Sequence, residues 1–456
     1  MAYRFRSAVS PLRRVRAQAL ASAIPTPAPT VDSLVASLAP AEPMHCLRPR
    51  QVAANARDFI AAFHDAVEQA LGDGARGAVM YAVKCNPDPT MLRALTEGGL
   101  RHFDCASPAE IRLARQMYPS AAVHYMHPVK NRAAIRAAYF EQSVRDFSLD
   151  SADELAKIVE VVAEGSFVGG APGADGVDAR LDPVAADLGL MIRLGMPKGQ
   201  AAYDLSAKFG AAFDEAVALL RAARPLAMRV GVCFHVGSQC MDPQAYTRAL
   251  AIADAVVKAA GVAIDVVDVG GGFPARYPDM DPPPLADYMA AIRDGLVAMD
   301  LAPNVQVWCE PGRALVATGA SVVVQVERRR GSELFINDGA YGSLADAGAL
   351  GMRFPVRLIR PTQAEALQEF SFWGPTCDSA DYMRGPFLLP ADIREGDWIE
   401  IGQLGAYGAA LRTAFNGFDQ ARLVEVRDAP LVATAGLVSA PVRRNSRYGI
   451  LRRRIA

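Results

Sequence analysis

Hydrophobic and polar positions follow two different rhythms along the first two thirds of the chain. Residues 51–71 place Phe59, Phe63 and Val67 on one helical face, and the short apolar run at 78–83 is typical of a buried strand. Further helices are predicted over residues 90–97 and 109–117, and further strands over 102–104, 123–126, 188–194, 228–235, 264–269 and 305–309. Alternating strands and helices predict parallel β/α units. Roughly eight units over about 260 residues predict an α/β fold, a closed (β/α)8 barrel.

The pattern changes near residue 315, where short β patterns with few helices begin. They lie at residues 322–326, 333–337, 356–359, 369–373 and 398–401. Short runs of this kind between turns predict a second, mainly β domain. The predicted organisation is an N-terminal arm over residues 1–45, a barrel over 46–312 and a β domain with a basic tail over 313–456. Glycines 165, 169, 170, 173 and 176 predict a loop insertion between two barrel units.

Both ends of the chain are basic. Residues 1–31 contain five arginines and no acidic residue, and they include a proline-rich stretch at 23–30. Organelle transit peptides share this composition, but the amphipathic pattern is poor and prolines interrupt it. A solvated basic arm is therefore the favoured interpretation, and the arginine-rich C-terminal tail is interpreted in the same way.

The composition excludes several classes of protein. Of the 456 residues, 51% are hydrophobic and 21% are charged, which excludes an intrinsically disordered chain. Lys and Arg total 48 against 49 Asp and Glu, so no basic excess favours binding to nucleic acid. No apolar run approaches the roughly 18 residues that a membrane helix needs. A soluble protein is therefore predicted. The seven cysteines are scattered and never form C-x-x-C, which predicts a reducing compartment, the cytoplasm, and no structural metal site.

Candidate chemistry lies at the ends of predicted barrel strands, where such barrels build their active sites. Lys84 ends the first strand, and an amine behind an apolar strand can have a lowered pKa and form a Schiff base with a carbonyl. His235 ends another strand, where its flat ring could stack on an aromatic cofactor, and Ser238 could hold phosphate. The alternatives are an ordinary lysine and a hydrogen-bonded structural histidine.

Two later strands are followed by groups that suit a phosphorylated pyridine. Gly270, Gly271 and Gly272 let backbone N–H groups approach an anion closely. Glu310 could keep a pyridine nitrogen protonated, and Arg313 offers a charged fork for phosphate. A tight turn and a surface ion pair are the corresponding structural alternatives.

The β domain contributes a thiol beside carboxylates. Cys377 and Asp378 follow a Gly-Pro-Thr turn, where a thiol could protonate a carbanion and a carboxylate could bind a cationic amine. Tyr407 and Phe415 supply a phenol and an aromatic loop. A turn with a buried cysteine, and aromatic side chains in a core, are the alternatives.

In this order the motifs resemble the fold-type III pyridoxal-phosphate decarboxylases, and within them the eukaryotic-type ornithine decarboxylases. The resemblance spans residues 50–425, and that family has an alanine-racemase-like barrel followed by a β domain. It rests on nine motifs: Tyr81-Ala-Val-Lys-Cys-Asn86, Phe103-Asp-Cys-Ala-Ser107, Leu205-Ser-Ala-Lys-Phe-Gly210, His235-Val-Gly-Ser238, Gly270-Gly-Gly-Phe-Pro274, Cys309-Glu-Pro-Gly-Arg313, Asn337-Asp-Gly-Ala-Tyr-Gly-Ser343, Gly374-Pro-Thr-Cys-Asp378 and Phe415-Asn-Gly-Phe418.

The resemblance implies a role for each residue around pyridoxal 5'-phosphate. Lys84 would carry the cofactor, His235 would stack on its ring and Glu310 would pair with its pyridine nitrogen. The remaining cofactor-binding residues implied are Asp104, Arg193, Ser238, Gly270, Gly271, Gly272, Arg313 and Tyr407.

The resemblance also implies a head-to-tail homodimer with shared active sites. Cys377 and Asp378 would enter the partner's site, together with Phe415 on the substrate side. The implied reaction is loss of the substrate carboxylate as CO2, followed by protonation of the substrate carbon by Cys377.

One departure from the family pattern concerns the substrate. In the ornithine enzymes a second acid grips the distal amine several residues after the Tyr-Gly-Ser motif. An ungapped extension from Tyr341 places Leu350 there, and Asp346 is the acid nearby. We hypothesise that Asp346 takes over this role from a shifted loop, which leaves room for a longer substrate.

The predicted activity is decarboxylation of a basic amino acid in polyamine biosynthesis, with ornithine and its product putrescine first and lysine second. Diaminopimelate decarboxylase and alanine racemase fit less well, because the Cys377-Asp-Ser-Ala-Asp381 motif matches neither. A non-catalytic regulatory paralogue of the antizyme-inhibitor type is the alternative from another class. Lys84, Glu310, Arg313 and Cys377 argue against that alternative, and the altered Leu350 region is its support.

Overall fold

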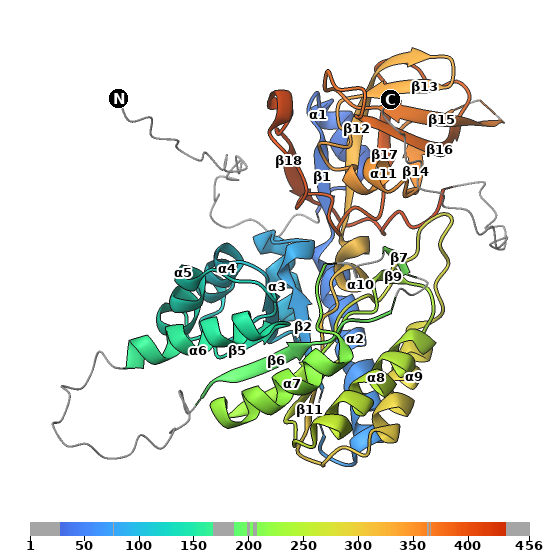
Figure 1. Cartoon of the computed structure of the whole chain (residues 1–456). Coiled ribbons are helices and arrows are strands. Elements are labelled where there is room, and N and C mark those ends of the chain that lie inside the picture. Colours follow the sequence, from blue (N-terminus) through green and yellow to red (C-terminus); the bar gives the residue numbers. More distant parts are fainter. Residues whose placement is uncertain are drawn as a thin grey trace, which may run out of the picture.

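The structure is a computed structural model that describes residues 28–75, 77–166, 187–197, 201–203, 208–362, 364 and 366–434. A barrel wrapped by helices lies below a mainly β domain (Figure 1). Most of the glycine-rich insertion predicted at 165–176, and the first three residues of the Leu205–Gly210 motif, lie outside the described residues. No helix among the described residues is long and apolar enough to cross a lipid bilayer.

Eight parallel strands of the described chain close into a barrel. In order around the barrel they are β10 (Val266–Asp268), β11 (Gln306–Cys309), β2 (Gly77–Ala82), β3 (His102–Cys105), β4 (Ala122–Tyr125), β5 (Asp146–Leu149), β6 (Gly189–Arg193) and β8 (Arg229–Cys233). Because all are parallel, their carboxyl ends lie on the same face of the barrel. The predicted (β/α)8 barrel is confirmed.

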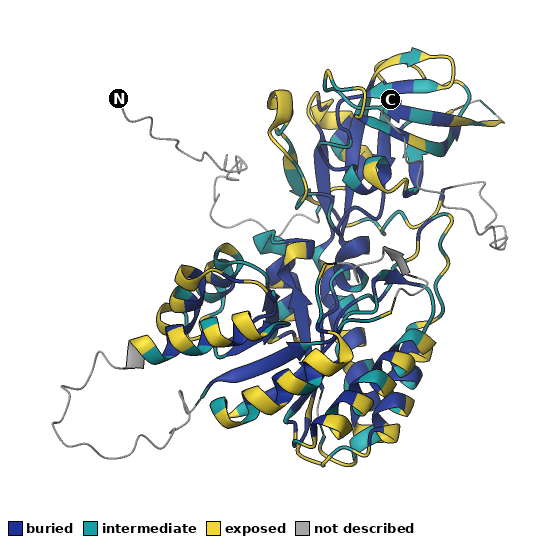
Figure 2. Ribbon diagram, viewed as in Figure 1, coloured by how far each residue is buried: buried dark blue, intermediate teal, exposed yellow. Residues whose placement is uncertain are grey.

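Helices cover the outside of the barrel with one apolar face inward (Figure 2). Phe59, Phe63 and Val67 are buried on α2, as the sequence pattern predicts. The covering helices are α2 (Pro49–Leu71), α3 (Pro89–Glu97), α4 (Pro108–Met117), α5 (Arg132–Arg136), α6 (Ala152–Ser166), α7 (Phe213–Ala223), α8 (Gln244–Ala260) and α9 (Leu285–Ala298). A two-stranded ribbon of β7 (Ala201–Tyr203) and β9 (Ser238–Cys240) is added to the barrel.

The second domain is built on a mainly antiparallel sheet that follows the short helix α10 (Arg313–Val316). Its strands are β12 (Ala320–Arg330), β13 (Glu333–Ile336), β14 (Val356–Leu358), β15 (Leu367–Trp373), β16 (Tyr382–Pro390), β17 (Trp398–Ile401) and β18 (Arg422–Glu425), and the helix α11 (Ala345–Ala349) lies in a connection. Its own apolar core includes Phe370, Phe372 and Phe387. The predicted mainly β second domain is therefore confirmed.

The N-terminal segment belongs to the β domain. The helix α1 (Val31–Leu38) leads into β1 (Met44–Leu47), which pairs with β12 and with β18. The predicted arm over residues 1–45 is thus wrong for residues 31–45, and the barrel begins after β1. All four residues of β1 are buried, and so short an apolar strand has no alternation that a sequence pattern could reveal.

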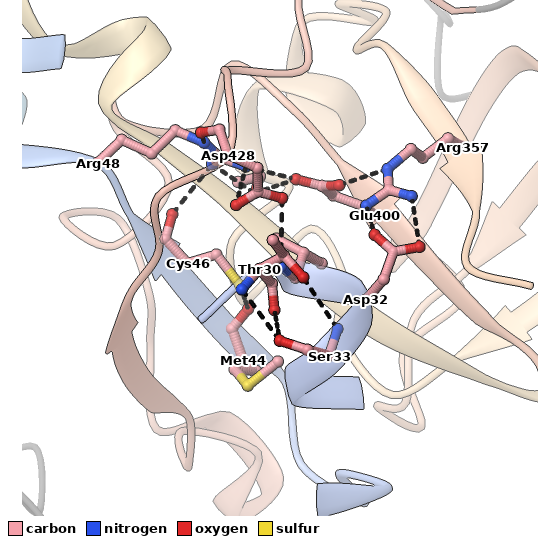
Figure 3. Close-up of polar contacts among 11 residues, drawn as sticks. Thr30, Asp32, Ser33, Met44, Cys46, Arg48, Arg357, Glu400 and Asp428 are labelled. Carbon is pink, nitrogen blue, oxygen red and sulfur yellow. Dashed lines mark hydrogen bonds and ion pairs between the residues drawn. The ribbon is translucent and has the colours of Figure 1, made fainter. Parts of the chain in front are cut away.

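A network of charged side chains anchors the N-terminal segment to the β domain (Figure 3). Arg48 Nη2 lies 2.9 Å from Glu400 Oε1, and Arg357 Nε lies 2.6 Å from Glu400 Oε2. Arg357 also pairs with Asp32 in α1, and Arg48 Nε donates to the Asp428 carbonyl. Arg48 and Glu400 are 3% and 1% exposed, so each depends on the other for its buried charge. The network joins residues from both ends of the described chain to one sheet.

Candidate active site

Lys84 stands at the carboxyl end of β2, in the single helical turn Val83–Cys85. Its Nζ lies 3.1 Å from Oδ2 of Asp104, which lies near the carboxyl end of the neighbouring strand β3. Removal from water by itself lowers the pKa of Lys84, but Asp104 and Glu310 outweigh it and raise the pKa. The predicted lowering is therefore wrong, because two acids face the amine. Because its pKa is raised, the Lys84 amine is protonated at neutral pH, and only the neutral amine is a nucleophile. The rate at which Lys84 attacks a carbonyl should therefore increase with pH.

Glu310 and Asp268 form a buried pair of acids at the ends of β11 and β10. Glu310 is 4% exposed and Asp268 is fully buried, and Oδ2 of Asp268 has no hydrogen-bond partner among the described residues. Burial and the neighbouring acids raise the pKa of Glu310, and burial raises the pKa of Asp268 to about 6. Two neighbouring buried carboxyl groups repel each other when both are ionised, and a protonated ring nitrogen would offset that repulsion. The pair therefore fits the pyridine nitrogen of pyridoxal phosphate.

His235 follows β8 and faces the glycine turn. Its Nδ1 accepts a hydrogen bond from the Gly237 N–H at 2.9 Å. Burial, together with the positive charges of Arg193 and Lys84, lowers the pKa of His235, so the ring is neutral at pH 7. A neutral planar ring beside Arg193, which ends β6, is suited to stacking on an aromatic cofactor.

The glycine turn leaves no room for side chains. A Cβ on Gly271 would lie 2.6 Å from the Glu310 carbonyl oxygen and 3.1 Å from His235 Nε2. Gly272 has a φ of +109°, and a Cβ there would lie 2.5 Å from the Gly237 carbonyl oxygen. Gly270 is equally crowded, with a positive φ of +68°. The turn therefore brings bare backbone close to the loop that leads to Ser238, which is a cradle fit for phosphate.

Arg313, at the start of α10, is buried among aromatic and acidic groups. Nη1 donates to the Tyr277 hydroxyl at 2.9 Å, and Nη2 donates to Asp346 Oδ2 at 3.1 Å. The Tyr407 ring centroid lies 4.9 Å from the guanidinium carbon. Tyr407 has a φ of +62°, a strained conformation, and its N–H donates to the Cys85 carbonyl next to Lys84. The structure thus brings the predicted phosphate ligands Arg313 and Tyr407 together.

The residues that sequence reasoning missed are Asp268 and Tyr277. The sequence could have revealed Asp268, because this residue comes at the end of a predicted strand, as Glu310 does. Tyr277 had none, since it lies in the loop after the glycine turn. Asp346 was predicted to bind the substrate amine, but its carboxylate is paired with Arg313.

A second cluster lies on the surface of the β domain. Cys377 and Asp378 are in the connection between β15 and β16, and Cys377 is the exposed one of the seven free cysteines. The Ala380 N–H and the Tyr341 hydroxyl both donate hydrogen bonds to Asp378, and these bonds lower the pKa of Asp378.

Aromatic and amide side chains complete this surface cluster. The Tyr341 and Phe415 ring centroids are 4.9 Å apart, and the Cys377 N–H donates to Asn416 Oδ1 at 3.1 Å. Phe415 is 41% exposed. The hydrogen bonds of the cluster stay within the β domain, so one chain presents the predicted site residues as two separate groups.

Comparison with known proteins decides the family. Residues 57–317 match the family model of the pyridoxal-dependent decarboxylase, pyridoxal binding domain. The chain belongs to this family. The predicted cofactor, pyridoxal phosphate, is confirmed by this membership.

The relatives of this pyridoxal-dependent decarboxylase include proteins named as decarboxylases and a protein named as an antizyme inhibitor. A lysine/ornithine decarboxylase from Selenomonas ruminantium is 31% identical over 367 residues, which cover 78% of this chain and 85% of that protein. Antizyme inhibitor 2 from Xenopus laevis is 30% identical over 365 residues, covering 75% and 74%. Among solved structures, the lysine/ornithine decarboxylase of Vibrio vulnificus complexed with putrescine has a TM-score of 0.69 at 27% identity, covering 87% and 97%.

Proposed function

We propose that this protein decarboxylates a basic L-amino acid, preferring L-ornithine, which yields putrescine and CO2, with L-lysine as the second substrate. The observation that carries the proposal is the barrel mouth, where an amine, a buried acid pair and a buried arginine fork converge from neighbouring strand ends. The amine can bind a phosphorylated pyridine aldehyde covalently, the acid pair can bind its ring nitrogen, and the arginine can bind its phosphate. The relative named lysine/ornithine decarboxylase supports the choice of substrates.

Each group at the barrel mouth has one task in this proposal. Lys84 holds pyridoxal phosphate, Glu310 keeps the ring nitrogen protonated with Asp268 behind it, and His235 stacks on the ring. The phosphate is bound by Arg313, Tyr407, Ser238 and the backbone of Gly270, Gly271 and Gly272, while Asp104 and Arg193 balance charge around the ring. When bound, the cofactor accepts the electron pair that departing CO2 leaves on the substrate carbon.

The surface cluster completes the site of a second copy of the chain. Cys377 gives its proton to the substrate carbon, Asp378 binds the distal ammonium of the substrate, and Phe415 packs against its methylene groups. The exposure of Cys377 and Phe415, and hydrogen bonds confined to the β domain, support this head-to-tail homodimer. The proposed compartment is the cytoplasm, which suits seven free thiols in the described chain.

The relative named antizyme inhibitor 2 keeps a second candidate open, a non-catalytic protein that binds a regulatory partner. A competition assay separates the two. The protein receives pyridoxal phosphate and equal ornithine, lysine, arginine and diaminopimelate, and mass spectrometry measures the amines formed.

We expect putrescine in excess and cadaverine second. Cadaverine in excess would reverse the order of substrates while retaining the decarboxylase. A protein that binds pyridoxal phosphate but forms no amine would contradict the proposal and favour the regulatory candidate.

A further inference from the structure

The ion pair between Arg313 and Asp346 connects the two halves of the proposed site. Arg313 belongs to α10 at the barrel, and Asp346 belongs to α11 in the β domain. Their side chains are 5% and 10% exposed, and Nη2 lies 3.1 Å from Oδ2. A buried charge is costly without a partner, so each residue holds the other in place.

Phosphate and Asp346 compete for one guanidinium. Nη1 of Arg313 is used by the Tyr277 hydroxyl, and Nη2 is used by Asp346. A phosphate dianion binds a guanidinium fork more strongly than a carboxylate held by one contact, and it repels a carboxylate on the same group. Phosphate binding at Arg313 therefore weakens the hold on Asp346.

The helix α11 determines where a released Asp346 can act. Leu350, the C-cap of α11, occupies the position where the family pattern expects the second acid and is 50% exposed. Asp346 lies four residues earlier, and residues four apart share one face of a helix. A carboxylate freed from Arg313 thus lies one helical turn from the position of the missing acid.

We propose that Asp346 is an exchangeable partner of Arg313: the cofactor phosphate takes over the guanidinium, and the released carboxylate binds the distal ammonium of the substrate. This inference rests on the proposed function and adds a coupling between cofactor and substrate. Reciprocity requires that a diamine strengthens binding of the phosphate by the same factor as the phosphate strengthens binding of the diamine.

Calorimetry on the full-length chain, dialysed free of pyridoxal phosphate, tests the coupling. The probes are pyridoxine 5'-phosphate, which has no aldehyde to react with amines, and putrescine. For the wild type we expect saturating putrescine to tighten binding of pyridoxine 5'-phosphate by about 10-fold, within the usual range of such couplings. Pyridoxine without phosphate should show no such effect.

Two variants assign the effect to Asp346. Asp346→Asn should bind pyridoxine 5'-phosphate at least as tightly as the wild type without putrescine, and should respond to putrescine less than 2-fold. Asp279→Asn is the matched control, because Asp279 pairs with Arg353 on the surface at 3.1 Å. It should behave as the wild type.

If putrescine leaves the affinity of the wild type for pyridoxine 5'-phosphate unchanged, the inference is overturned. It is also overturned if putrescine tightens this binding in Asp346→Asn as much as in the wild type. In both cases pyridoxine 5'-phosphate still binds, so the proposed function would survive. A wild type that binds no pyridoxine 5'-phosphate would overturn the inference and the proposed function together.

Discussion

Replacing Lys84 by alanine should lower amine formation by about 1,000-fold or more, since covalent attachment of the cofactor depends on this amine. The substitution removes the nucleophile and also leaves Asp104, which is 2% exposed, without the cation 3.1 Å away. Lys84→Arg separates these effects, because arginine keeps the positive charge but its guanidinium does not condense with an aldehyde. We expect Lys84→Arg to be as inactive as Lys84→Ala.

Release of CO2 measures the loss of activity. Borohydride reduction followed by mass spectrometry of the intact protein measures the covalent attachment, and only proteins that retain Lys84 should gain the mass of the cofactor. Lys258→Ala is the control, because Lys258 pairs with Asp254 on the surface of α8 and is 63% exposed. An arginine variant with turnover within 10-fold of the wild type would remove Lys84 from its assigned role.

Replacing Cys377 by alanine should lower amine formation by about 100-fold, the usual scale for losing a positioned proton donor. Without the thiol the substrate carbon would lack its proton donor, and part of the product should appear as an aminoaldehyde, whose amino group would be transferred to the cofactor and replaced by oxygen from water. Mass spectrometry of the products therefore distinguishes this variant from one that is merely misfolded.

Cys46→Ala is the matched control, since Cys46 is a buried thiol in β1 of the same domain. It should retain the wild-type product. An unchanged rate and product for Cys377→Ala would exclude Cys377 as the proton donor.

Much of the barrel mouth could be predicted from the sequence. Lys84, Asp104, His235 and Glu310 each follow a short apolar run, and the ends of parallel strands must meet on one face of a barrel. Once the eight β/α units are recognised, the side chains at the strand ends must converge on one face of the barrel. The predicted cradle of three glycines follows from the same reasoning, because only glycine tolerates the close approach to the loop after His235.

Contacts between side chains distant in sequence could not be predicted in this way. The pairing of Asp346 with Arg313 depends on how the β domain sits over the barrel, and no local pattern encodes that. The strand β1 was missed because four buried residues carry no period, and its partners in β12 and β18 lie far along the chain. The pKa of Lys84 was predicted in the wrong direction because burial was considered without Asp104 and Glu310.

In the proposed dimer, a barrel mouth from one chain and a thiol cluster from the other make each active site. Mixing two inactive variants, Lys84→Ala and Cys377→Ala, tests this arrangement. Half of the dimers in an equal mixture are mixed, and each mixed dimer has one intact site of two, so about a quarter of the wild-type activity should return.

Different affinity tags on the two variants verify that mixed dimers have formed. Recovery of about a quarter of the wild-type amine formation is expected if the two chains share their active sites. Tagged mixed dimers that remain as inactive as the separate variants would contradict it.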